Sequence, residues 1–160
     1  MAPVVADASV LLALGTLHRL ELLRHLFQHV SIPPAVAREV SGSLPRLPDW
    51  IGVVEPRSMS VVQGAIGLHQ GEIEALALAV ELRASLIILD DLPARRHART
   101  LGFTIVGTAG ILVMAKRAGA IPSVREALDV LREGGFRLRQ DVYEQVLADA
   151  GEELPDSTTP

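Results

Sequence analysis

Short, fully apolar runs alternate along this chain with stretches that have the spacing of helices, and this alternation limits the possible folds more than any other feature. Val4–Ala6, Val30–Ile32 and Leu86–Leu89 are three or four residues long, which is typical of buried strands. Strands without a polar face, separated by helices, indicate a mainly parallel sheet that is covered on both sides. The sequence therefore predicts an α/β fold.

The helices and remaining strands follow from periodicity and from helix start and stop signals. Ser9 is positioned to cap the first helix, Gly15 to end it, and Thr108 to cap a later one. The patterns predict strands at Ile51–Val54 and Phe103–Val106, and helices at Val10–Leu14, Thr16–Phe27, Pro33–Val40, Glu72–Arg83, Pro93–Leu101, Ile111–Ala118, Ser123–Glu133 and Arg139–Ala150.

The composition excludes several classes of protein. Of the 160 residues 49% are hydrophobic, enough for one domain with a substantial core. The absence of cysteine excludes disulfides, thiol nucleophiles and thiolate metal sites, and it suits a reducing cytoplasm. No apolar run approaches the roughly 18 residues of a membrane span, and no basic segment precedes an apolar one at the N-terminus. We therefore expect a cytoplasmic protein that does not contact a membrane.

The acidic residues near the C-terminus change how the net charge of −4 is interpreted. We expect residues 1–150 to form a single domain and residues 151–160, with Glu152, Glu153 and Asp156, to form a disordered acidic tail. The domain itself is then nearly neutral, and all of its cations except Lys116 are arginines. Arginine suits forked contacts with phosphate, but this charge neither requires nor excludes a nucleic-acid partner.

Acidic residues recur where ligands collect in α/β folds, at the carboxyl ends of parallel strands. Asp7 follows the first predicted strand, and Asp90 and Asp91 follow a later one, so these side chains are expected at one edge of the sheet. Glu39 and Glu72 lie on apolar helices. Each acid also has a structural explanation, as a turn residue, a helix cap or a favourable charge in a first helical turn. Several acids at one edge, without a comparable group of cations, favour a functional site.

Helical geometry separates Glu72 from Glu74. At 100° per residue, Glu72 lies within roughly 40° of Leu76 and about 20° of Ala79, on the side expected to be buried. Glu74 lies about 20° from Glu81, on a more charged side, so we expect it to be solvated or weakly paired. The sequence predicts that Glu72 points inward.

Clustered carboxylates require compensation, because they repel one another and lose hydration when they are buried. A hard divalent cation such as Mg²⁺ or Mn²⁺ supplies it, since these ions take oxygen ligands and keep several waters. Beside a phosphate, such a cation activates water and steadies the attacking and leaving oxygens of a hydrolysed phosphodiester. No histidine base is needed for this chemistry.

Several short motifs together resemble those of a PIN domain, most closely the PIN-like subgroup related to VapC-type toxins of toxin–antitoxin pairs. They extend over about residues 3–150: Val4-Val5-Ala6-Asp7-Ala8-Ser9, Ile32-Pro33-Pro34-Ala35-Val36 followed by Glu39, Gly71-Glu72 with Glu74-Ala75, Ile88-Leu89-Asp90-Asp91 with Ala94-Arg95, and Gly107-Thr108-Ala109-Gly110. The resemblance implies a three-layer fold with a central, mainly parallel sheet. It also implies a Mg²⁺- or Mn²⁺-dependent endoribonuclease that forms a homodimer and is held by a cognate antitoxin.

The resemblance also assigns the acids to roles, residue by residue. Asp7 matches the first-strand aspartate, Glu39 the helix glutamate and Glu72 the third acid, which is often Asp in the wider family. The fourth acid falls on Asp90 or Asp91, and the sequence leaves that choice open. The catalytic set is therefore Asp7, Glu39, Glu72, Asp90 and Asp91, and all of these except Glu39 are expected metal ligands.

Other residues are assigned supporting roles. Ser9 matches a small hydroxyl residue near the metal in many PIN domains, and Thr108 has a possible second role facing the site. Arg95 begins a basic stretch that either forms a solvated helix face or holds the RNA backbone. Apolar positions on the early helices, among them Leu17 and Phe27, favour a homodimer.

Two other functions remain as alternatives to the nuclease. One is a catalytically silent PIN-like module that binds RNA or protein. The other is a Mg²⁺-dependent phosphoaccepting domain. Such a domain has a lysine at the end of a late strand, whereas the only lysine here, Lys116, lies within a predicted helix, which makes this alternative the weaker one. Dinucleotide, P-loop and α/β-hydrolase motifs are all absent from the sequence.

Overall fold

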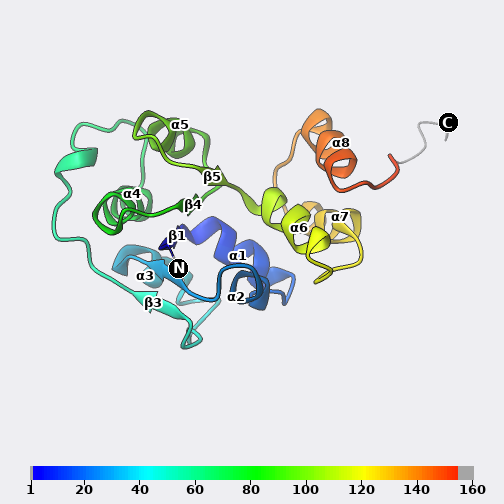
Figure 1. Cartoon of the computed structure of the whole chain (residues 1–160), viewed down its shortest axis with the longest axis horizontal. Helices are drawn as coiled ribbons and strands as arrows, with labels where there is room; N and C mark the ends of the chain where they lie inside the picture. The colour runs from blue at the N-terminus through cyan, green and yellow to red at the C-terminus, as the bar shows by residue number, and fades with distance from the viewer. Residues whose placement is uncertain (1, 155–160) are drawn as a thin grey trace. The chain divides into compact units, whose positions relative to one another are not determined.

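A computed structural model of the chain describes residues 2–154 and divides into two compact units (Figure 1). The first unit is Met1–Thr108 and the second is Ala109–Pro160. The first contains the whole sheet and all of the acids expected at its edge. The second is helical.

Five parallel strands form the sheet, in the order β3-β2-β1-β4-β5. They are β1 (Val4–Ala6), β2 (Val30–Ile32), β3 (Ile51–Val53), β4 (Leu86–Ile88) and β5 (Ile105–Val106). The first strand lies in the middle and pairs with β2 through Val5 and Ser31, and with β4 through Ala6 and Ile88. The order changes direction at β1, and crevices at such points are where open α/β sheets bind ligands.

Helices cover both faces of this sheet, so the predicted three-layer α/β fold is confirmed. The helical segments of the first unit are α1 (Ala8–Thr16), α2 (Glu21–Phe27), α3 (Pro34–Val40), the 3₁₀ turn η1 (Ser60–Val62), α4 (Gln70–Leu82) and α5 (Leu92–Thr100). Figure 1 shows α3 and α4 side by side on one side of the strands, with α1 and α2 on the other. The core between these layers is aliphatic, with Val5, Leu14, Leu76 and Ile87 fully buried.

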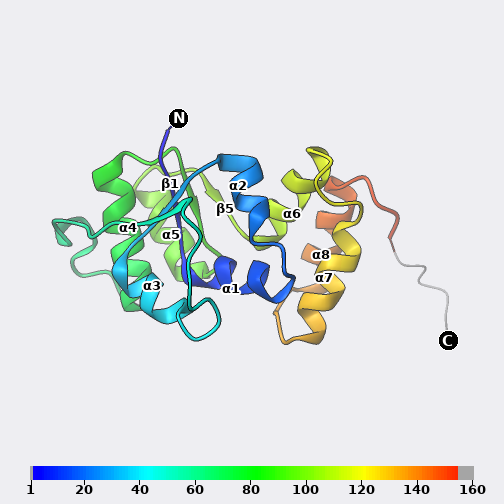
Figure 2. The same cartoon turned by 90° about the horizontal axis from the view of Figure 1, so that it is seen from below.

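The first helix differs from its prediction because it begins directly at the end of β1 (Figure 2). Asp7, rather than Ser9, occupies the N-cap position, and α1 continues past Gly15 to Thr16. His18 then takes a left-handed conformation, with φ 52°, so no helix runs through Thr16–Phe27 and α2 begins only at Glu21. Both the predicted Ser9 cap and the Gly15 stop are therefore wrong.

The second unit consists of α6 (Thr108–Arg117), whose first residue closes the first unit, α7 (Val124–Glu133) and α8 (Gln140–Asp149). Ser123 caps α7, accepting a hydrogen bond from the Glu126 amide at 3.2 Å. Glu152 lies in the segment expected to be a tail, yet its carboxylate accepts from the amides of Val124 at 2.6 Å and Arg125 at 3.1 Å. Residues 155–160 of the expected tail lie outside the described residues.

Within residues 2–154, none of the helices has the length and apolar character needed to cross a lipid bilayer.

Candidate active site

The five predicted acids surround one cavity of about 300 Å³ in the first unit. Its lining residues are Asp7, Ser9, Glu39, His69, Glu72, Asp90 and Asp91, a set that we call the acid pocket. Asp7 follows β1 and Asp90 follows β4, so the pocket opens at the carboxyl ends of the two central strands. Within the described chain, neither lysine nor arginine lines it. The pocket therefore gathers negative charge.

Asp7 lies deepest in this arrangement. Its amide donates to the Ile88 carbonyl at 2.9 Å, which extends the pairing of β1 with β4 by one residue and fixes the backbone. Its side chain is buried, with 4% of the residue exposed. Burial raises the pKa of Asp7 to about 6, against a lowering hydrogen bond from the Ala8 amide.

Three nearby carboxylates, those of Glu72, Glu39 and Asp90, also raise the pKa of Asp7. Like charges at close range disfavour ionisation of each group, and burial strengthens the effect because less water screens it. The like charges of the pocket are thus an electrostatically costly arrangement.

Gly71 allows Glu39 to reach the pocket. A β-carbon at this position would lie 3.1 Å from Oε2 of Glu39 and 3.7 Å from Oδ1 of Asp7. It would also lie 3.4 Å from a methyl group of Val36, so the start of α4 approaches α3 more closely than a larger residue permits. The sequence placed Gly71 only at the start of a helix and gave no reason for its identity.

Glu72 points inward as predicted, with 7% of the residue exposed. Its Oε2 accepts a hydrogen bond from the His69 amide at 2.8 Å, which ties the carboxylate to the first turn of α4. Burial raises the pKa of Glu72, and the Asp91 and Glu39 charges raise it further, while the His69 amide and ring lower it. The presence of His69 in the pocket was not foreseen, because its position before the helix suggested no contact with the acids.

The adjacent aspartates Asp90 and Asp91 have different partners. Asp90 Oδ1 accepts from the Thr108 amide at 2.8 Å, and its Oδ2 accepts from the Thr108 hydroxyl at 2.6 Å. Asp91 is the N-cap of α5, and its Oδ2 accepts from the Ala94 amide at 3.1 Å. Thr108 therefore fixes Asp90. The prediction that Thr108 caps a helix starting at Ile111 is wrong, because α6 begins at Thr108 itself.

Gly107 and Arg95 complete the surroundings of Asp90. A β-carbon on Gly107 would lie 2.6 Å from Asp90 Oδ1 and 2.7 Å from Arg95 Nη1, so only glycine fits without a shift. Arg95 is not among the lining residues, and its Nη1 donates to the Leu89 carbonyl at 3.1 Å. Burial lowers the pKa of Arg95, as does the charge of Arg99, while Asp90 opposes the shift.

Glu74 is not solvated, so this part of the prediction is wrong. Only 6% of the residue is exposed, because α3 packs over that side of α4. Arg38 on α3 lies 3.9 Å from Glu74 Oε2, and the Gln70 amide group donates to the same oxygen at 3.3 Å. Glu74 is therefore a buried, weakly paired carboxylate outside the acid pocket.

Comparison with known families identifies this combination of fold and acidic edge. A family model described as a PIN domain, DUF3368, matches residues 3–152. The chain belongs to the PIN domain family. A search of curated proteins finds no match. PIN domains are generally nucleases that use divalent metals and act on nucleic acid.

The oxygens of the pocket fit a hard cation in kind and in charge. Ser9 Oγ is buried there without a hydrogen-bond partner, which leaves one polar atom in the lining unsatisfied. Throughout residues 2–154, however, no three His, Asp or Glu side chains converge closely enough to hold one ion together. Mg²⁺ is commonly held by one or two carboxylates and several waters, and this set can supply that arrangement.

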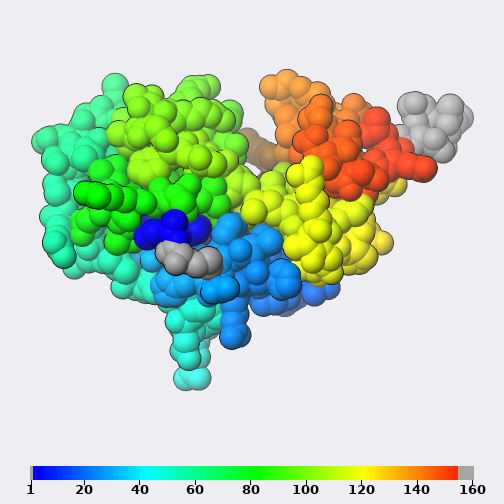
Figure 3. Space-filling model, viewed as in Figure 1, coloured from blue at the N-terminus to red at the C-terminus, as the bar shows by residue number. Residues whose placement is uncertain are grey.

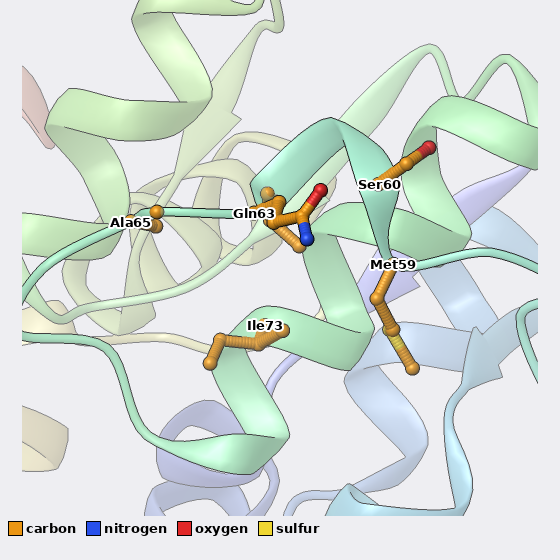
Figure 4. Close-up of a pocket in the computed structure, with 7 residues that line it drawn as sticks. Met59, Ser60, Gln63, Ala65 and Ile73 are labelled. Atoms are coloured by element: carbon orange, nitrogen blue, oxygen red, sulfur yellow. The ribbon is translucent and has the colours of Figure 1, made fainter.

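A second cavity of the first unit, about 390 Å³, carries no comparable chemistry (Figure 4). It lies between the segment around η1 and α4, and its lining residues are Met59, Ser60, Val62, Gln63, Gly64, Ala65 and Ile73. None of these side chains titrates near neutral pH. Of these two cavities, only the acid pocket is lined by carboxylates.

Proposed function

We propose that this PIN domain is a Mg²⁺- or Mn²⁺-dependent endoribonuclease that hydrolyses phosphodiester bonds at the acid pocket. The observation that carries the proposal is the meeting of five carboxylates around one cavity, with the pKa of Asp7 raised to about 6. Such a concentration of like charge destabilises a fold unless a cation binds there. A silent binding module has no need to retain it.

Asp7, Glu72, Asp90 and Asp91 are the residues that we assign to the cation, one or two of them as direct ligands and the others through its bound waters, with Ser9 and Glu39 beside them. When bound, a divalent cation offsets the charge of the phosphate and acidifies a water molecule. No lysine or arginine among the described residues lines the pocket, so its carboxylates remain free to accept hydrogen bonds from the attacking water.

Two of these carboxylates are already oriented by the fold. Thr108 occupies both oxygens of Asp90, and the His69 amide binds Oε2 of Glu72. The second oxygen of Glu72 is left to accept a hydrogen bond from water, and burial raises the pKa of this carboxyl above its usual range. Asp90 and Glu72 thus keep their geometry without help from the substrate.

The experiment incubates purified protein with single-stranded and structured RNAs, with Mg²⁺, Mn²⁺ or chelator. We expect cleavage with a divalent cation, none in chelator, and none for Asp7→Asn. Asp141→Asn is the matched control. Asp141 is exposed and lies in the second unit, where the structure of residues 2–154 pairs it with Arg139 alone. Undiminished cleavage in chelator, or by Asp7→Asn, contradicts the mechanism. Stable RNA binding without cleavage under every metal condition would support the silent module.

We further propose that the chain is the toxin of a type II toxin–antitoxin pair and forms a homodimer, with residues 1–150 acting as one domain in the cytoplasm. The family match extends over both compact units, which supports a single functional domain. Leu17, Leu20 and Phe27 remain half-buried and so retain apolar surface for a second copy. Light scattering at micromolar concentration tests the dimer, and growth arrest on expression, relieved by an adjacent gene product, tests the toxin.

A further inference from the structure

The first unit has a third cavity, of about 620 Å³, whose chemistry is opposite to that of the acid pocket. Its lining residues are Arg24, Arg46, Leu47, Pro48, Asp49 and Trp50, a set that we call the arginine–tryptophan pocket. Arg24 comes from α2, and the others come from the segment between α3 and β3, which projects from the surface in cyan in Figure 3. The only tryptophan of the chain thus lies beside two guanidinium groups.

The lining of this pocket is held in place by its backbone. The Trp50 carbonyl accepts from the Val30 amide at 3.1 Å, and the Ile51 amide donates to the Pro48 carbonyl at 3.0 Å. Trp50 is therefore attached directly to the edge of the sheet, and Pro48 restricts the turn before it. The backbone of Trp50 is thus fixed before a ligand binds, which lowers the cost of ordering this part of the lining.

The polar groups of the pocket have no partner that explains them. Across residues 2–154, neither Arg24 nor Arg46 forms an ion pair with an acid. Asp49, which lines the same pocket, is not within ion-pair distance of either. Two exposed guanidinium groups, one carboxylate and one half-buried indole therefore face a common space.

We infer that the arginine–tryptophan pocket binds one nucleotide of single-stranded RNA. The guanidinium groups of Arg24 and Arg46 suit a phosphate, and the indole of Trp50 offers a face on which a base stacks. Asp49 repels phosphate but accepts hydrogen bonds from a ribose hydroxyl, the group that distinguishes RNA from DNA. An isolated anion would use only the arginines, so the full set favours a nucleotide.

The position of the pocket sets its relation to the acid pocket. Arg24 and Trp50 precede β2 and β3, so the arginine–tryptophan pocket lies at the amino ends of parallel strands, whereas Asp7 and Asp90 follow their strands. A three-residue strand spans about 10 Å, so one nucleotide does not occupy both pockets. This inference rests on the proposed ribonuclease, for which the second pocket would hold a distant part of the substrate.

The test measures binding in chelator, where the proposed cleavage does not occur. Since Trp50 is the only tryptophan, its fluorescence reports directly on stacking. A short, single-stranded, 5′-phosphorylated oligoadenylate should quench it saturably, with affinity that falls as salt rises. Inorganic phosphate, adenosine and the matching DNA should bind at least about tenfold more weakly, because each lacks at least one of the three recognised groups, the phosphate, the base and the ribose hydroxyl.

Variants assign the effect to individual side chains. Arg24→Gln and Arg46→Gln should each weaken quenching several-fold, and Trp50→Ala should weaken binding of labelled RNA about tenfold. Arg137→Gln, which removes an exposed arginine from the other unit, should leave binding unchanged. Circular dichroism checks that each variant is folded.

Three results would overturn the inference: no saturable quenching, equal binding of inorganic phosphate or DNA, or full binding by both arginine variants. Quenching without metal-dependent cleavage would instead reject the ribonuclease and retain the pocket. Cleavage without quenching would retain the ribonuclease and reject the nucleotide-binding pocket, so the two proposals can fail separately.

Discussion

Asp7 in the first unit and Glu152 in the second are both carboxylates beside the start of a helix, yet the protein shifts their pKa values in opposite directions. Burial raises the pKa of Asp7 to about 6, and neighbouring carboxylates reinforce the shift. Burial also acts upward on the pKa of Glu152, but hydrogen bonds from Val124, Arg125 and Ser123 lower it overall. Lys116 adds a cation at 3.2 Å. The two carboxylates therefore differ both in depth, since Asp7 is the more deeply buried, and in the partners that surround them.

This comparison separates a structural carboxylate from a functional one. The fold supplies Glu152 with amide, hydroxyl and ammonium donors, so its charge is satisfied without a ligand. It surrounds Asp7 with like charge instead, and this repulsion is relieved when the carboxyl is protonated or when a cation binds. Repulsion at the acid pocket lowers the stability of the fold, as expected at a site where a bound cation would supply the opposite charge.

The largest expected effect is on catalysis, and we expect it for substitution of Asp7 but not for substitution of Glu152. Asp7→Asn should reduce Mn²⁺-dependent RNA cleavage at least about 100-fold, because it removes a buried charge from the proposed cation site. Glu152→Gln should keep the activity of the folded molecules, since its partners all lie in the second unit. Initial rates are measured on folded protein of known concentration. Equal losses of cleavage activity in both variants would contradict the division into a functional and a structural carboxylate.

The pH dependence of stability tests the pKa of Asp7 in chelator. Between about pH 4 and pH 6, the unfolded chain releases this proton while the folded carboxyl keeps it, so rising pH favours unfolding. The free energy of unfolding should therefore fall by about 3 kcal/mol across this window, from a shift of roughly two pH units. Urea unfolding as a function of pH measures it, with Asp7→Asn as the variant that should lose most of the slope.

Adding metal sharpens the same measurement. A cation that binds only the folded state should raise the stability of the wild type at neutral pH by about 2.7 kcal/mol at 100-fold saturation. Asp7→Asn should gain much less. A wild-type melting temperature that is the same with saturating Mn²⁺ and with chelator would argue against a preformed site.

Glu152→Gln should destabilise the protein by about 1–3 kcal/mol at neutral pH, because a charged acceptor of several buried hydrogen bonds is lost. Since the pKa of Glu152 is lowered on folding, its contribution is present above the unfolded pKa and disappears as pH falls through the folded value. Thermal unfolding at neutral and acidic pH measures the difference. Glu153→Gln, an exposed neighbour, is the control.

The sequence predicted the strands, most of the helices and the five acids because these depend on local rules. Apolar runs form buried strands, and acids that follow parallel strands reach one edge. Asp7 and Asp90 could be assigned to one edge for this reason, whereas Glu72 was placed by helical geometry and by the family resemblance. The different hydrogen-bond partners of Asp90 and Asp91 could not be predicted, because Asp90 is bound by Thr108, which is 18 residues away.

Features that arise from packing between helices and strands could not be predicted from the sequence. Gly71 and Gly107 look like ordinary turn or helix-start residues, and only the proximity of Glu39 and Arg95 explains why they lack a side chain. The burial of Glu74 was missed because helical periodicity does not tell which second helix covers a given side. Ser9 was mistaken for a cap because α1 begins sooner than its apolar spacing suggested.

The smallest expected effect belongs to Glu74→Gln, which tests whether position in the acid pocket, rather than burial, defines a functional carboxylate. Glu72 and Glu74 are almost equally buried, at 7% and 6% exposure, and they lie two residues apart on α4. Only Glu72 lines the acid pocket, whereas Glu74 faces Arg38, whose side chain is largely exposed and weakens the pair through solvent screening. Glu74→Gln should therefore keep cleavage within about twofold and change stability by no more than about 1 kcal/mol, as the exposed partner implies. Glu72→Gln, assayed beside it, should lose cleavage while remaining folded. If Glu74→Gln alone lost activity, burial beside α3 would matter more than the pocket, and the assignment of Glu72 would be wrong.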